Sequence, residues 1–141
     1  MTGNELLCKL NNSYEMYMHC NTADKLDRET YSFILADIPK GVDITKKQAA
    51  IIIHEYLKRV LKEEDEKDTK KALELKDLYD CRICVKHIEQ VYLKGIMDPI
   101  IDEASAIKDD LPILFGGNEI LNDEDAYKAI DRVFNLNRRL I

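Results

Sequence analysis

Residues 44–57 read ITKKQAAIIIHEYL, and this stretch decides the fold. Thr45 can accept a hydrogen bond from the third backbone N–H of a helix, and the Gln48 side chain can reach back to the Thr45 N–H, which is the capping-box pattern. Apolar residues then recur every three or four positions, as they do on the buried face of an amphipathic helix. The stretch therefore predicts a helix over 45–62.

Helical periodicity continues through the rest of the chain. Asn4 is placed to cap the first of the other helices, Asn122 to cap the last, and Gly95 to end the one between them in a left-handed conformation. The predicted ranges are 5–20, 31–36, 80–94, one or two turns within 99–107, and a last helix from 122 onward.

Composition excludes several classes of protein. The chain has 141 residues, of which 45% are hydrophobic, but its longest apolar run is 49–53, far short of a membrane span. The formal net charge of −6 disfavours binding to nucleic acid or to anionic membranes. No secretory signal follows Met1, so the chain is expected in the cytoplasm if Met1 is the native start, and at the cell wall or outside the cell if an upstream signal is removed.

Cysteines and histidines supply the candidate chemical groups. The four cysteines are too sparse for a disulfide-built scaffold, so reduced thiols are expected. A zinc site is the alternative, but it would need a second close ligand pair, and we predict no metal and no cofactor. The residues it would draw on are Cys81 and Cys84 with Cys8, Cys20, His19 or His87.

Catalytic motifs are not evident in the sequence. His19, His54 and His87 are scattered and lie on or beside apolar helical stripes, which is typical of core histidines with satisfied ring nitrogens. The sequence contains no nucleophile elbow, phosphate-binding glycine loop or metalloprotease motif. We therefore expect a protein that is not an enzyme.

Residues 121–134, LNDEDAYKAIDRVF, match 44–57 at an offset of 77 positions. This indicates an internal repeat, although any two capped amphipathic helices share such features. The predicted fold is all-α: two helix-loop-helix repeats and an N-terminal helix packed as one compact helical domain. The expected parts are 1–62 for the N-terminal helix and first repeat, 63–76 for a charged connection, and 77–141 for the second repeat.

The second copy follows a recognisable order of motifs. Leu75-Lys76-Asp77 precedes a helix ending in Lys94-Gly95-Ile96, then come a loop with Phe115-Gly116-Gly117 and the helix start at 121–126. This order resembles an S-layer homology repeat. The first copy keeps mainly the helix start, residues 43–50.

The resemblance implies a non-catalytic helical module that binds bacterial cell-wall polysaccharide, usually through three repeats. In that family an Arg at the second helix contacts an acidic glycan, and the matching positions are Lys46 and Asp123. Ligand binding is therefore expected at Thr45, Lys46 and Gln48. A third copy is not evident in residues 1–40.

The second functional hypothesis is an intracellular helical protein-protein interaction or assembly module that has lost glycan binding. Its partner would be another protein. Because the resembled family uses three repeats and only two are evident, we expect an uncovered apolar flank, covered by self-association or by the N-terminal helix.

Overall fold

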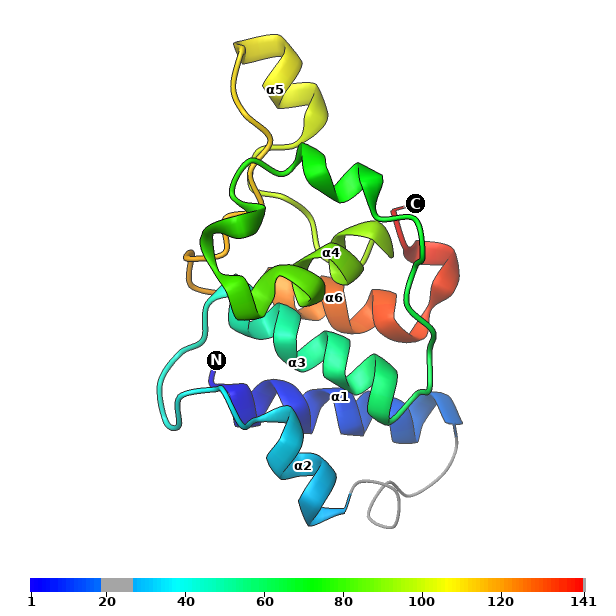
Figure 1. Cartoon of the computed structure of the whole chain (residues 1–141). Coiled ribbons are helices and arrows are strands. Elements are labelled where there is room, and N and C mark those ends of the chain that lie inside the picture. Colours follow the sequence, from blue (N-terminus) through cyan, green and yellow to red (C-terminus); the bar gives the residue numbers. More distant parts are fainter. Residues whose placement is uncertain (19–26, 141) are drawn as a thin grey trace.

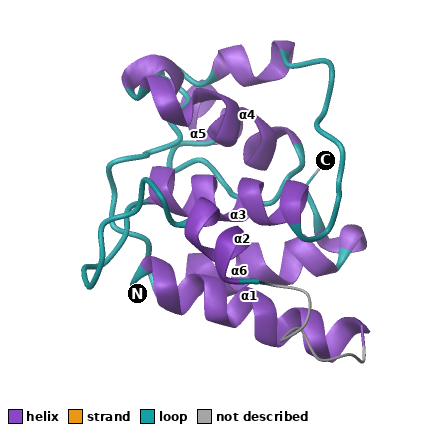
Figure 2. Cartoon of the chain, turned by 60° about the horizontal axis from the view of Figure 1, so that its bottom comes forward, coloured by secondary structure: helices purple, strands orange, loops and turns teal. Residues whose placement is uncertain are grey.

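The computed structural model describes residues 1–18 and 27–140, and within these ranges the chain consists of helices and loops without a strand (Figure 1, Figure 2). The predicted all-α class is confirmed. The α-helices are α1 (Gly3–Met18), α2 (Arg28–Ile34), α3 (Lys46–Arg59), α4 (Val85–Leu93), α5 (Glu103–Asp109) and α6 (Asp123–Phe134). The short 3₁₀ helices are η2 (Lys70–Glu74), η3 (Leu78–Asp80), η4 (Arg82–Cys84) and η5 (Leu136–Arg138).

Helix α3 lies at the centre, with α1 on one side and α4 on the other (Figure 1). The predicted apolar stripe of this helix is buried, because Ile52, Ile53 and Leu57 have almost no exposed surface. The same core continues into α1, α4 and α6 without a break. Burial of this continuous apolar surface supplies the main favourable term for folding.

The structure confirms the predicted cap at the start of α3. The Gln48 N–H donates to Thr45 Oγ1 at 3.4 Å, and the Thr45 N–H donates to Gln48 Oε1 at 2.9 Å. Helix α3 ends at Arg59, three residues before the predicted end, and Lys62 beyond it has a left-handed backbone with φ 56°. A right-handed helix cannot continue through such a residue.

The other predicted helix ends are partly right. Asn122 caps α6 by accepting the Asp125 N–H at 2.8 Å, and Gly95 has the expected left-handed φ of 69° after α4. Helix α4 begins at Val85, five residues later than predicted, because the preceding residues form the separate turns η3 and η4.

The start of α1 differs from the prediction. The Glu5 N–H donates to Thr2 Oγ1 at 3.2 Å, and the Thr2 N–H donates to Glu5 Oε1 at 3.3 Å, so Thr2 is the cap. Asn4 lies within the helix and accepts a hydrogen bond from the Tyr31 hydroxyl. The prediction of Asn4 as the cap is therefore wrong, and residues 1–14 align with 44–57 at an offset of 43 positions.

This alignment adds a third helix start to the two found in the sequence. The Ile44 N–H donates to the Met1 carbonyl at 3.0 Å, and the Leu121 N–H donates to the Ile44 carbonyl at 2.9 Å. Met1, Ile44 and Leu121 are equivalent positions, so each start is hydrogen-bonded to the preceding one in the same way. The antiparallel bridges Thr2–Asp43 and Thr45–Ile120 repeat with the same offsets.

The three helices that follow these starts pack together. Helix α1 packs against both α3 and α6, and the equivalent residues Leu6, Ala49 and Ala126 are fully buried. The rings of Tyr56 and Phe134 also meet edge to face, with centroids 6.3 Å apart. Helix α1 therefore covers the apolar flank that two repeats alone are expected to leave exposed.

The charged connection predicted at 63–76 is fixed at its start. Arg139 donates two hydrogen bonds to the Glu63 carboxylate, at 2.8 and 3.0 Å, and Lys94 Nζ donates to the Glu64 carbonyl at 2.6 Å. Burial opposes the charged form of Glu63, but the hydrogen bonds from Arg139 and Lys94 outweigh it and lower its pKa. This part of the connection is an anchored segment.

Two sequence expectations fall outside the described residues, namely the last two residues of the helix predicted over 5–20 and the proposed ligands His19 and Cys20. In the ranges that are described, none of the helices combines the length and the apolar character needed to cross a membrane.

Two glycines provide a test of the backbone geometry. Gly41 and Gly95 both have positive φ, but a Cβ at Gly41 would meet open space, whereas one at Gly95 would overlap the backbone of Leu140. Gly41→Ala is expected to lower the free energy of unfolding by about 1–2 kcal/mol through backbone strain. Gly95→Ala adds a backbone clash, so its expected cost is roughly 2–5 kcal/mol. Urea unfolding of both variants measures the difference, and equal losses would contradict the close packing of Leu140 on Gly95.

Candidate functional site

The candidate site lies where the start of α3 meets the loop that leads into α6. The Lys46 N–H donates to the Glu119 carbonyl at 2.9 Å, and the Lys47 N–H donates to the Gly117 carbonyl at 3.0 Å. These are two of the first N–H groups of α3, which have no partner within the helix. The loop before α6 therefore completes the start of α3.

Asp77 holds the same loop from the other side. Its two carboxylate oxygens accept the backbone N–H groups of Phe115 and Gly116, at 2.9 and 2.8 Å. Gly116 has φ 78°, and a Cβ there would lie 2.6 Å from the Ile100 side chain. Glycine is favoured at this position because its backbone conformation is left-handed, and any side chain there would also have to displace that of Ile100.

Lys46 is buried beneath this loop, with 4% of its surface exposed. Its ammonium donates to the carbonyls of Asp98 and Phe115, both at 2.7 Å, and lies 4.7 Å from the centre of the Phe115 ring. Burial lowers the pKa of Lys46, and the nearby Asp125 carboxylate acts in the opposite direction. Lys46 thus ties the start of α3 to two separate loops, the one before α5 and the one before α6.

A pocket of about 280 Å³ opens beside this junction, between the start of α3, the loop before α6 and the segment that leads into α4. Its apolar wall comes from Ile88 and Leu114. Lys47 is half-buried at the pocket and donates to Asn118 Oδ1 at 2.7 Å. The polar side chains that line the pocket are Lys47, Asp77, Asp80, Asn118 and Glu119.

The predicted ligand-binding residues Thr45, Lys46 and Gln48 flank Lys47 at the start of α3, but none of the three is among the residues that line this pocket. Thr45 and Gln48 are engaged in the capping box, and the Lys46 ammonium is bound by two backbone carbonyls. Each predicted residue therefore has a partner within the protein, and ligand binding by them stays a prediction.

Sequence reasoning missed the polar groups that line the pocket, Lys47 and Asp77 among them. The side chain of Lys47 is half-exposed, whereas that of the adjacent Lys46 is buried. Only this difference in burial distinguishes the two lysines. Asp77 belongs to the Leu75-Lys76-Asp77 motif, but the two loop residues that donate hydrogen bonds to it lie 38 and 39 positions away in the sequence.

The cysteines differ from the sequence expectation. Cys81 and Cys84 form a disulfide, with 5.3 Å between their Cα atoms, so the expectation of reduced thiols is wrong for this pair. The turn η4 brings the two residues to a separation that a disulfide can span. In the described part of the chain, no group of three or more His, Cys, Asp or Glu side chains is arranged to hold a metal ion. Cys81 also lines the pocket described above.

Comparison with family models, with curated proteins and with solved structures finds no match for this chain.

The two adjacent lysines allow a matched test of the buried tie. Lys46→Met keeps the length of the side chain but removes the donor to two buried carbonyls, so the free energy of unfolding should fall by roughly 2–4 kcal/mol. Lys47→Met alters a partly exposed side chain and should change it by less than about 0.5 kcal/mol. Urea unfolding of the two variants gives both values, and similar losses would argue against a structural role specific to Lys46.

Proposed function

We propose that this protein is a non-catalytic binding module that holds bacterial cell-wall polysaccharide in the pocket at the start of α3. The observation that carries the proposal is that the pocket recurs. A second pocket, of about 600 Å³, lies at the start of α1. It is lined by Thr2, Asn4 and residues 38–41, and also by four residues in or just after α2, namely Tyr31, Ser32, Leu35 and Ala36. Asn4 is equivalent to Lys47, and residues 39–41 are equivalent to residues 116–118, which line the first pocket.

A polymer of repeated sugar units suits pockets that recur with the repeats of the protein. Sugar rings carry hydroxyl groups that both donate and accept hydrogen bonds, and they have apolar C–H faces. The first pocket offers a cation at Lys47, acceptors at Asp80 and Glu119, and an apolar wall. Such a mixture is typical of small-molecule sites.

The charges at the first pocket indicate which polysaccharide fits. Asp77, Asp80 and Glu119 outnumber Lys47, and Lys46 is withdrawn from solvent. An acidic sugar would meet net repulsion at this pocket, because the carboxylates of Asp80 and Glu119 outnumber the Lys47 cation even though that of Asp77 is held by backbone N–H groups. The proposed ligand is therefore a neutral or amino-sugar polysaccharide, which differs from the acidic glycan that the resemblance implied.

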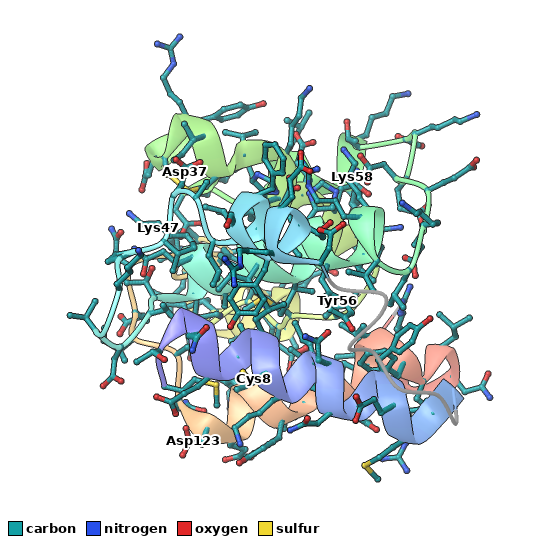
Figure 3. The ribbon with its side chains drawn as sticks, turned by 90° about the horizontal axis from the view of Figure 1, so that it is seen from below. Cys8, Asp37, Lys47, Tyr56, Lys58 and Asp123 are labelled. Carbon is teal, nitrogen blue, oxygen red and sulfur yellow. A yellow bond between two sulfur atoms is a disulfide. The ribbon has the colours of Figure 1, made fainter. Side chains whose placement is uncertain are left out.

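Cosedimentation with purified cell-wall polysaccharide tests this proposal. Lys47 and Lys58 are lysines at opposite ends of α3 (Figure 3), so Lys58→Ala is a matched control for Lys47→Ala. Lys47→Ala should weaken binding roughly tenfold through loss of a charge-assisted hydrogen bond, while Lys58→Ala should leave it unchanged. If the unaltered protein does not sediment with the polysaccharide, glycan binding is excluded.

The second pocket predicts a dependence on ligand length. Asn4→Ala should weaken binding to long polysaccharide, which can reach both pockets, but not to a disaccharide that occupies only the first. Isothermal titration with fractions of defined length measures the two affinities. The same loss for both fractions would contradict simultaneous use of the pockets.

An assembly module is the second candidate, favoured by the apolar surface around α5. This helix projects from the body of the molecule (Figure 1), and Ile107 on it is 77% exposed, with Ile100 and Leu111 also exposed nearby. Exposed apolar clusters often mark protein interfaces. Light scattering should then detect an oligomer that Ile107→Glu dissociates. A protein that remains monomeric at high concentration would remove self-association from consideration.

A further inference from the structure

A chain of three side chains joins α3, α4 and the charged connection. His54 Nδ1 lies 2.8 Å from His87 Nδ1, and His54 Nε2 lies 2.7 Å from Asp65 Oδ1. His54 is 2% exposed, His87 is half-buried, and Asp65 is at the surface. The proposed polysaccharide pocket does not use this cluster.

The hydrogen-bond geometry fixes where the protons lie. An ionised Asp65 only accepts, so His54 Nε2 must donate to it. Neutral His54 then has a lone pair on Nδ1, and His87 must donate its Nδ1 proton to that lone pair. Both hydrogen bonds form when the two imidazoles are neutral, without any added proton.

One added proton leaves this arrangement intact. If it binds to His87 Nε2, the Nδ1–H of His87 still donates to His54. If His54 becomes the cation, its Nδ1–H donates to His87 Nδ1, so the donor and the acceptor of this bond exchange. A second proton places an N–H on both facing nitrogens, so the 2.8 Å contact becomes repulsive.

We propose that His54, His87 and Asp65 form an acid-sensitive joint, which holds α4 on α3 while the pair carries at most one added proton and opens when both imidazoles are protonated. The charged groups that face His87 are Glu55 and Lys58 of α3 and Asp65 of the connection, besides His54 itself. Asp65 and Glu55 favour a positive charge on His87, whereas Lys58 and a protonated His54 oppose it.

The part that opens is defined by the contacts of the connection. Gln90 of α4 binds both backbone groups of Glu66, at 2.7 and 3.1 Å, and Lys94 binds the Glu64 carbonyl. Residues 64–66 are therefore attached to α4. When the histidine contact is lost, α4 and this segment lose this polar attachment to α3, while the apolar contacts of Ile88 and Val91 in the shared core remain.

The expected pH dependence follows from the folded-state environment. Burial, followed by the neighbouring His54, lowers the pKa of His87. Below about pH 6.5 the unfolded chain then binds more protons than the folded protein, so stability is lost as the pH falls. One such proton raises the unfolding equilibrium constant by up to about tenfold per pH unit within this window.

Urea unfolding of the full chain between pH 7.5 and 5.0 tests the joint. In the unaltered protein the unfolding equilibrium constant should rise as the pH falls below 6.5. In His87→Asn this rise should be smaller. Asp65→Asn keeps an acceptor oxygen but removes the counter-charge, so it should make the dependence steeper. An unchanged pH dependence in His87→Asn would overturn the proposal.

Nitrogen NMR of the histidine rings provides a test that needs no variant. At pH 7.5 the proton should lie on Nε2 of His54 and on Nδ1 of His87. The reverse tautomers would overturn the proposal, as would stoichiometric zinc in protein purified without chelator, since a metal would then occupy the place of the shared proton.

Discussion

The backbone hydrogen bond from each helix start to the preceding one is the constraint on which the rest of this structure depends. It joins Leu121 to Ile44 and Ile44 to Met1, so α1, α3 and α6 begin at positions fixed relative to one another. Their equivalent apolar residues then fall in the same buried region. The pockets at the starts of α1 and α3 recur because the loops beside them are set by this same bond.

The buried Lys46 adds a polar tie to this arrangement. A charge without a partner inside a protein is costly, but two carbonyls and the face of Phe115 surround this ammonium. The loop before α6 is held on one side by Lys46 and on the other by Asp77. The shape of the candidate site thus rests on two charged side chains that are themselves occupied by the protein.

Local signals in the sequence predicted much of the fold. The capping box at Thr45, the cap at Asn122 and the left-handed Gly95 are each determined by a few neighbouring residues, and all three are confirmed. The predicted start of α1 is wrong because Asn4 is also a good cap, although Thr2 and Glu5 have the same capping-box spacing as Thr45 and Gln48. A disulfide across Cys81 and Cys84 depends on a turn that helical periodicity does not reveal.

The candidate site was harder to predict because its contacts are distant in sequence. Thr45, Lys46 and Gln48 were placed at the correct helix start, but a pattern of residues does not distinguish a lysine that faces solvent from one that is buried under a loop. Residues 98 and 115, which bury Lys46, are separated from it by 52 and 69 positions. Tertiary structure alone assigns Lys47 rather than Lys46 to the pocket.

The same distances govern the order in which the chain can fold during synthesis. The ribosome produces α1 and α3 well before the loop at Phe115 and the start of α6 at Leu121. Until those residues emerge, Lys46 stays hydrated, and the first N–H groups of α3 have water as their partner. Contacts that close such long loops form late, because the chain must first lose much conformational freedom. The start of α3 therefore acquires its native hydrogen bonds only after the C-terminal third of the chain has been synthesised.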